Sequence, residues 1–379
     1  MAVTFWEMVA LMSVVTVCGN VFVAPHAFVT AAGHVWWVPF AGGMAVTLFL
    51  TALMAKVRNR HPRVPALQWP QVFFGPVIGR IVLFLWLFDL FLSIVGDLWL
   101  ITSVITITEL FSTPHQALVT AVALAVLAGA LSGLANLARL SPLAAAGNAF
   151  TLIIAVFVGR FFLDYGYLLP LTQWQDLRPQ SLEFWVSLAH VIRYVPMIAI
   201  LAGMAPPGVQ AWLAPWVGIL IGETIVGLTI VSPIASLGME GARVIHRPFN
   251  YLADAIEIAN FPLRRIGSLA QLFFTVNLLF TMATRMAVVG LGLKTLLPKL
   301  KVQSYVILAF VLALGLAIPI ANTEVAPEIW FYYVTVSSLA FVPIVIVLWL
   351  VATWRKADAD PLAATIPAEE SGGQWHAAS

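Results

Sequence analysis

Ten apolar runs, all but the short ninth long enough to cross a lipid bilayer, constrain this chain more than any other feature. A transmembrane helix needs about 20 mostly apolar residues, and such runs recur along almost the whole sequence. Hydrophobic residues make up 61% of the 379 residues and charged residues only 9%, whereas a soluble domain carries about 25% charged residues. We therefore predict an all-α polytopic membrane protein. Its ten transmembrane helices run approximately over Thr4–Val29, Trp36–Ala55, Arg80–Phe111, Gln116–Leu137, Leu143–Leu163, Phe184–Met204, Ala211–Leu237, Leu269–Leu293, Tyr305–Ile320 and Ile329–Trp354.

Lysine and arginine residues near the span ends indicate the orientation, because short cytoplasmic loops are enriched in them. With a cytoplasmic N-terminus, eleven of the nineteen basic residues fall on the cytoplasmic side. Both termini are then cytoplasmic, and residues 355–379 are interpreted as a short disordered tail. The cytoplasmic basic residues are Lys56, Arg58, Arg60, Arg63, Arg80, Arg139, Lys294, Lys299, Lys301, Arg355 and Lys356.

The outer connection between residues 240 and 265 contains apolar residues at roughly helical spacing. Phe249, Leu252 and Ile256 alternate there with Asp254 and Glu257. We interpret this pattern as an amphipathic helix that lies on the membrane surface. It serves either as a plain cover of the loop or as a functional gate.

Several ionisable and polar side chains stand inside the third and eighth spans, where lipid disfavours them unless they face a cavity or a partner. Depth along a helix follows from a rise of about 1.5 Å per residue. If the two helices touch, residues at equal depth form a ladder of one charge pair and two polar pairs, with ordinary interhelical hydrogen bonding as the alternative. The pairs of equal depth are Asp89 with Arg285, Ser93 with Thr281, and Asp97 with Asn277.

Three carboxyl groups at membrane depth are candidates for proton or ion coupling. Asp89 and Asp97 lie in the third span, and Glu223 lies deep in the seventh. Carboxyl groups inside transporters commonly relay protons. A purely structural role is the alternative for each of them.

The first and sixth spans contain residues that interrupt a helix: Gly19 and Asn20 in the first, and Arg193, Tyr194 and Pro196 in the sixth. Proline removes a backbone donor and frees carbonyl groups. The sixth span comes five spans after the first, so the second group of five has the inverted topology. Interrupted helices at corresponding positions of two inverted halves indicate a transporter-like site at the bilayer midplane. A simple glycine-mediated helix crossing is the alternative for the first span.

The predicted organisation is a first five-helix repeat at residues 1–168, an inverted five-helix repeat at 180–354, and the tail. The chain contains no G-x-x-x-x-G-K-[ST], H-E-x-x-H or G-x-S-x-G motif, so we do not expect an enzyme. Cys18 is the single cysteine, which excludes an intrachain disulfide and multi-cysteine metal sites. We expect no cofactor and no metal. A net charge of +2, spread over short loops, does not indicate a nucleic-acid partner; the expected surroundings are membrane lipids.

The chain resembles the spore germination permease family, the membrane-embedded B subunit of nutrient germinant receptors, within the amino acid–polyamine–organocation transporter superfamily. The resemblance rests on the ten spans, on a first helix with glycine and then proline, and on a basic, proline-rich loop after the second span. It also rests on SLGMEG…HRPFNYLADAIEIANFPLRRIGSL before a polar eighth span. An I-x-x-F-x-x-R-I-E type of motif is carried there by Ile258, Phe261, Arg265 and Ile266, with one extra residue and with Gly267 in place of the acidic residue.

The resemblance implies two inverted five-helix repeats whose broken first and sixth helices surround a central site, lined also by the third and eighth. It implies a small amino-acid-like germinant as the ligand. Arg193 or Arg285 would suit the carboxylate of that ligand, and Asp97 or freed carbonyl groups would suit its amine. The implied partners are the larger A-type membrane subunit and the C-type lipoprotein of the receptor, in the inner spore or cell membrane. A proton-coupled amino acid transporter is the alternative function.

Overall fold

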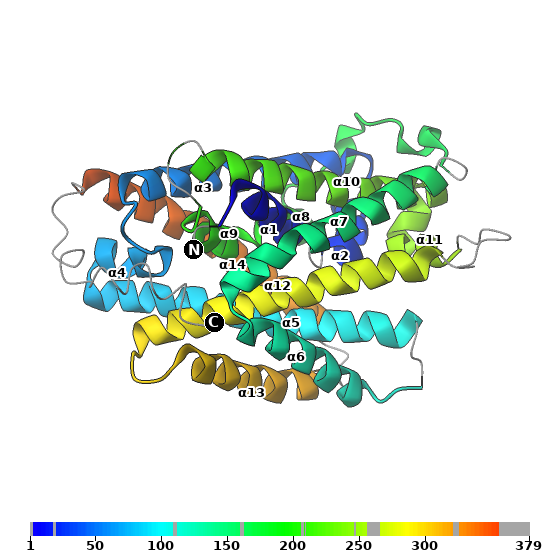
Figure 1. Ribbon diagram of the computed structural model, residues 1–379. Coiled ribbons are helices and arrows are strands. Elements are labelled where there is room, and N and C mark those ends of the chain that lie inside the picture. The colour runs from blue at the N-terminus through cyan, green and yellow to red at the C-terminus, as the bar shows by residue number, and fades with distance from the viewer. Residues whose placement is uncertain are drawn as a thin grey trace.

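The structure is a computed structural model that describes residues 3–17, 20–108, 112–159, 163–205, 208, 210–245, 248–255, 266–320 and 326–355. Within this part every regular element is helical, and most long helices lie side by side along one direction (Figure 1). The elements are α1 (Phe5–Val17), α2 (Asn20–Ala32), η1 (Gly33–Val35), α3 (Trp37–Arg60), η2 (Ala66–Gln68), α4 (Trp69–Phe74), α5 (Pro76–Thr108), α6 (His115–Leu131), α7 (Leu134–Gly159), η3 (Tyr165–Leu168), η4 (Trp174–Asp176), α8 (Leu182–Ile192), α9 (Val195–Ala202), α10 (Gln210–Val244), α11 (Pro248–Ala255), α12 (Ile266–Leu296), α13 (Val302–Ile320) and α14 (Ala326–Trp354).

Each predicted span corresponds to one helix or to one broken helix. The first span is α1 with α2, the sixth is α8 with α9, and the others are α3, α5, α6, α7, α10, α12, α13 and α14. By length and composition, seven helical segments in the described part can cross a membrane, and α6 with α7 makes an eighth if that bent pair counts as one span. The 13 residues of α1 rise only about 20 Å. The first crossing therefore needs both α1 and α2.

The junction of the fourth and fifth spans differs from the prediction. α6 ends at Leu131 and α7 already begins at Leu134, with a bend of 116° between them. Gly133 lies between the two helices with φ = +86°, a backbone conformation that glycine adopts without a Cβ clash. Pro142, which was predicted to lie between spans, is inside α7.

The α1 half of the first broken helix packs most extensively on α10. A Cβ atom at Gly218 would lie 2.5 Å from the Val9 carbonyl oxygen, and one at Gly222 would lie 2.8 Å from Thr16 Cβ. These two glycines therefore allow the backbones of α1 and α10 to approach closely, as small residues commonly do at membrane helix interfaces.

The second broken helix is interrupted where the sequence predicted it. α8 ends at Ile192, Arg193 and Tyr194 form a turn, and Pro196 stands in the first turn of α9, a position that tolerates proline. The indole N–H of Trp86 on α5 donates a hydrogen bond of 2.8 Å to the Pro196 carbonyl oxygen. The break is thereby tied to the third span.

The outer connection begins with a kink. Gly238 has φ = +74° within α10, so the straight part of that helix ends close to the predicted Leu237. α11 then forms the beginning of the predicted amphipathic segment. It does not simply lie on the surface, because Phe249 is buried and packs edge-to-face on Phe274 of α12 at 5.7 Å. Residues 256–265, which carry most of the motif quoted above, lie outside the described part.

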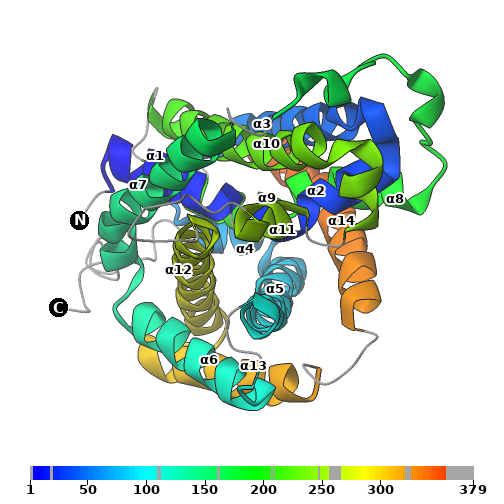
Figure 2. The same ribbon diagram turned by 90° about the vertical axis from the view of Figure 1, so that its right-hand side faces the viewer.

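α5 occupies an inner position in the bundle. In the end-on view it lies beside α12, with α6 and α13 on one side and α14 on another (Figure 2), and it packs directly on α12, α13, α6 and α9. The third span therefore meets the eighth, as the equal-depth argument required, and it also meets the sixth.

Candidate functional site

Asp97 of α5 lies at the centre of a buried charge cluster. One carboxylate oxygen accepts a hydrogen bond of 2.7 Å from Arg193 Nη2, and the other accepts a hydrogen bond from Arg285 Nη1. Asp97 is fully buried, Arg193 and Arg285 nearly so. The cluster joins three elements that are far apart in sequence, namely α5, the break between α8 and α9, and α12.

Tyr194 packs against both guanidinium groups of this cluster. Its ring centroid lies 4.9 Å from Arg193 Cζ and 5.5 Å from Arg285 Cζ, which places both cations within range of a cation–π interaction. Tyr194 is fully buried. The turn between α8 and α9 therefore supplies one cation, Arg193, and an aromatic ring, Tyr194, that contacts the guanidinium groups of both Arg193 and Arg285.

Arg285 forms its ion pair with Asp97 and not with Asp89, the residue predicted at its depth. Residue counting from the helix ends ignores helix tilt and the length of the arginine side chain, which reaches roughly 6–7 Å along a helix, more than one turn. Asp97 had been matched with Asn277, and no hydrogen bond joins them. The prediction that α5 and α12 meet is confirmed, but the predicted pairs Asp89–Arg285 and Asp97–Asn277 are wrong.

Asp89 belongs to a separate polar group between α5 and α14. Tyr333 Oη donates to Asp89 Oδ1 at 2.7 Å and lies 2.8 Å from its backbone carbonyl oxygen. Ser337 hydrogen-bonds to Asp89, and Ser93 to Tyr333. Sequence reasoning missed Tyr333 and Ser337, although two polar residues four apart in the tenth span were a usable signal.

Asn277 and Thr281 precede Arg285 on α12 at intervals of four residues, so the three share one face of the helix. Both are buried, and neither the Asn277 amide nor the Thr281 hydroxyl has a hydrogen-bond partner among the described residues. Buried polar groups are normally hydrogen-bonded. These two side chains therefore offer unused donors and acceptors on the helix face that carries Arg285, about one and two turns away from it.

Glu223 of α10 is fully buried, and neither carboxyl oxygen has a hydrogen-bond partner in the described part. Its neighbour Gly222 packs on α1, where a Cβ would lie 2.9 Å from the Ser13 carbonyl oxygen. An isolated buried carboxylate is very costly, and the described part gives this carboxyl neither an ion pair nor a hydrogen bond. Glu223 thus differs from Asp97, whose carboxylate is paired with two arginines.

The remaining predicted residues lie at or beside the first break. Gly19 lies outside the described residues. Asn20 is the first described residue after it and belongs to α2, so the predicted break itself falls outside the described part. Among the described residues, no group of three histidine, cysteine, aspartate or glutamate side chains has the arrangement of a metal site.

Comparison with known sequences identifies the family. The sequence profile of the spore germination protein family, a permease family, matches residues 2–325. The chain belongs to the spore germination protein family. No curated protein sequence gives a significant match to this permease.

Comparison with solved structures identifies the fold of this permease. One similar structure is that of Mhp1, a nucleobase-cation-symport-1 family transporter in a closed conformation with bromovinylhydantoin bound. The TM-score is 0.64 at 14% identity, over 91% of this chain and 77% of Mhp1. The permease therefore has the transporter fold of two inverted five-helix repeats with broken first and sixth helices.

Proposed function

We propose that this permease is the ligand-sensing membrane subunit of a nutrient germinant receptor and that the Asp97 cluster binds a small amino-acid-like germinant. The observation that carries the proposal is the arrangement of Arg193 and Arg285 around Asp97. Two guanidinium groups share one carboxylate, so the three side chains have a formal charge of +1. Asp89, eight residues away and about 12 Å along α5, hydrogen-bonds to Tyr333 and acts on the two arginines only as a more distant charge. A ligand carboxylate would balance the excess charge, and arginine binds carboxylates through two parallel hydrogen bonds.

Other groups beside the cluster suit the rest of an amino acid. The Asn277 amide oxygen and the Thr281 hydroxyl have unused hydrogen-bonding capacity and would accept hydrogen bonds from an ammonium group. The Mhp1 structure contains a small organic ligand, bromovinylhydantoin, which supports ligand binding by this fold. The family description supports a role in spore germination.

The position of the site would allow ligand binding to change the arrangement of several helices of the bundle. It joins α5, α12 and the break between α8 and α9, so a ligand that prefers one arrangement of these helices shifts the population toward it. In a receptor, that shift would be passed to the A-type membrane subunit and the C-type lipoprotein in the inner spore or cell membrane. Recovery of both partners with this chain from spore membranes, read by mass spectrometry, tests this part.

A proton-coupled amino acid transporter is the second candidate. Glu223 favours it, because a buried carboxyl without a cation can take up and release a proton during a transport cycle. The two functions differ in flux. A sensor binds amino acids without accumulating them, whereas a transporter accumulates them in response to a pH gradient.

Purified protein in proteoliposomes separates the candidates. Saturable binding of a radiolabelled amino acid without gradient-driven accumulation supports the sensor, and sustained accumulation supports the transporter. Arg285→Gln should abolish either signal, and Arg80→Gln, an exposed arginine at the start of α5, should preserve it. Absence of binding and uptake for every amino acid contradicts both candidates.

The orientation with both termini in the cytoplasm and the division at 1–168, 180–354 and 355–379 are part of the same proposal. Single-cysteine variants test the orientation in cells, after Cys18 is replaced by serine. An impermeant thiol reagent should label Gln175→Cys, which follows α7, from outside. It should label Gln303→Cys, at the start of α13, only after permeabilisation. The reverse pattern would refute the orientation.

A further inference from the structure

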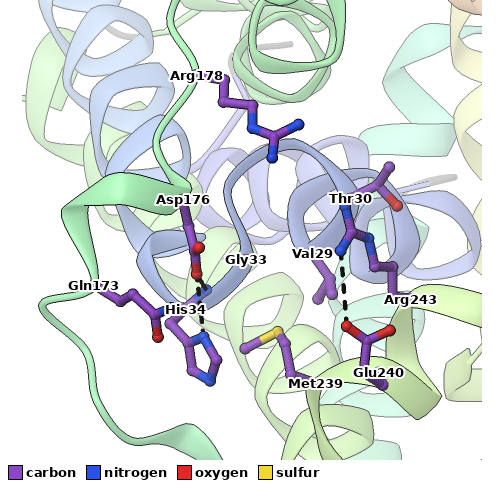
Figure 3. A pocket seen from close by; sticks show the side chains of 10 residues that line it. All are labelled: Val29, Thr30, Gly33, His34, Gln173, Asp176, Arg178, Met239, Glu240 and Arg243. Carbon is purple, nitrogen blue, oxygen red and sulfur yellow. Dashed lines mark hydrogen bonds and ion pairs between the residues drawn. The ribbon is translucent and has the colours of Figure 1, made fainter.

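A small cavity of about 160 Å³ lies beside the C-terminal end of α2 (Figure 3). Three segments enclose it: the end of α2 with the following turn, the residues after the kink in α10, and the segment between α7 and α8. This is smaller than the roughly 300–1,000 Å³ of sites for drug-sized ligands, so the cavity suits a molecule of only a few non-hydrogen atoms. None of its lining residues belongs to the Asp97 cluster. The nearest lining residue on α2, Val29, is nine residues beyond Asn20, about 13 Å along the helix.

One carboxylate of the cavity is already committed. Asp176 Oδ2 lies 3.2 Å from both the backbone nitrogen and Nδ1 of His34. Gly33 makes this contact possible, because a Cβ at that position would lie 2.7 Å from Asp176 Oδ2 and its φ is +49°. The His34–Asp176 pair therefore forms a fixed wall of the cavity.

The two arginines of the cavity are not committed in the same way. Arg243 Nη1 lies 3.7 Å from Glu240 Oε1, and the two side chains are 47% and 81% exposed. Such an exposed ion pair contributes little to stability. The described residues give the Arg178 side chain no ion pair or hydrogen bond. Figure 3 shows the guanidinium group of Arg178 directed toward the space beside Thr30 and Arg243. The Arg178 guanidinium thus has no carboxylate partner in the described part of the chain, and Arg243 has only the weak, exposed pair with Glu240.

We propose that this cavity is a second, outer binding site for a small carboxylate-bearing molecule, held by Arg178 and Arg243. Guanidinium groups bind carboxylates in a planar, two-bond geometry. The Glu240 carboxylate, which also lines the cavity, would suit a ligand that carries an ammonium group as well. Because the cavity joins the end of α2 to α10, a bound molecule would hold the second half of the first broken helix against α10. The site is independent of the central one and goes beyond the proposed function.

Arginine-specific labelling of the purified full chain with phenylglyoxal, read peptide by peptide by mass spectrometry, tests the proposal. The probes are sodium acetate and L-alanine, compared with sodium chloride and methylammonium chloride at equal ionic strength. Acetate or L-alanine should slow labelling of Arg178 and Arg243 about tenfold at a concentration of about ten times Kd. Labelling of the exposed Arg80 should not change. Unchanged labelling of Arg178, or equal slowing by the chloride salts, would overturn the site.

A variant pair sharpens the test. Arg178→Gln removes an exposed side chain, so it should fold normally and should abolish the protection of Arg243, whereas Arg80→Gln should leave that protection intact. Protection of Arg243 that persists in Arg178→Gln would contradict the proposal. The central site is read separately through the amino acid binding lost in Arg285→Gln, so failure of one site leaves the other result interpretable.

Discussion

Trp86 and Pro196 are joined by a hydrogen bond of 2.8 Å from the indole N–H to the carbonyl oxygen. The bond links the third span to the break in the sixth, one turn or less from Arg193. Its donor and acceptor both lie in the buried core. This hydrogen bond therefore stabilises the break between α8 and α9. Because Trp86 and Asp97 both belong to α5, it also fixes the position of the break relative to Asp97.

Trp86→Phe keeps the aromatic bulk and removes the donor. A buried carbonyl left unsatisfied costs about 1–3 kcal/mol, so the melting temperature in detergent should fall. Trp354→Phe changes an exposed tryptophan (81% exposed) at the end of α14 and should have no effect. Equal melting temperatures for Trp86→Phe and the wild type would show that the bond does not hold the break.

Asp97→Asn leaves two buried guanidinium groups without their shared carboxylate. Removing one partner of a buried ion pair costs about 3–5 kcal/mol, so stability should fall sharply. The double variant Asp97→Asn/Arg193→Gln should be less destabilised than the sum of the single variants, with a coupling of about 0.5–3 kcal/mol. Thermal unfolding of the four proteins completes the cycle, and strict additivity would contradict the ion pair.

Glu223→Gln should behave differently from Asp97→Asn. A protonated carboxyl and an amide are nearly isosteric, so we expect a stability change of less than about 1 kcal/mol, within the range of mild substitutions. If Glu223 couples protons, the variant should also lose the pH dependence of amino acid uptake or binding. Destabilisation as large as that of Asp97→Asn would indicate an ionised Glu223 with a cationic partner.

Gly218→Ala should destabilise the contact between α1 and α10. The added Cβ would lie 2.5 Å from the Val9 carbonyl oxygen, and overpacking of this kind costs about 1–3 kcal/mol. Gly315 of α13 has no neighbour within 4 Å of a built Cβ. Gly315→Ala should therefore be neutral or stabilising by up to about 1 kcal/mol. Similar melting temperatures for the two variants would refute the close approach.

Tyr333→Phe removes the hydroxyl group that donates to Asp89. The variant should lose about 1–3 kcal/mol, because the buried carboxyl keeps fewer donors. Tyr165→Phe alters a tyrosine that is 61% exposed and serves as the control in the same thermal unfolding assay. A Tyr333→Phe variant as stable as this control would show that the group between α5 and α14 is not structural.

The sequence predicted the helices well because hydrophobic length and proline or glycine breaks are local properties. The ten spans, the break at Arg193–Pro196 and the convergence of the third and eighth spans all follow from such local signals. The pairs of residues that contact one another across helices do not follow from local signals. Arg285 contacts Asp97 and not Asp89 because tilt and side-chain reach shift the register between helices, and one sequence contains no measure of either.

The outer cavity was also beyond sequence reasoning. His34 and Asp176 are 142 residues apart and meet only because the segment after α7 folds back over the end of α2. The α6–α7 boundary was misplaced for a different reason. Gly133 was an available turn signal, but the apolar run continues past it.

Amino acid binding to the purified permease tests the central claim most directly. Each of the protein amino acids is offered to the wild type, to Arg285→Gln and to Arg80→Gln, and the change in melting temperature is measured. We predict that at least one amino acid stabilises the wild type and Arg80→Gln by about 2.7 kcal/mol at a concentration of 100 Kd. The same amino acid should not stabilise Arg285→Gln, and its decarboxylated amine should not stabilise any of the three proteins. An equal shift in Arg285→Gln, or a shift with the amine alone, would contradict the account.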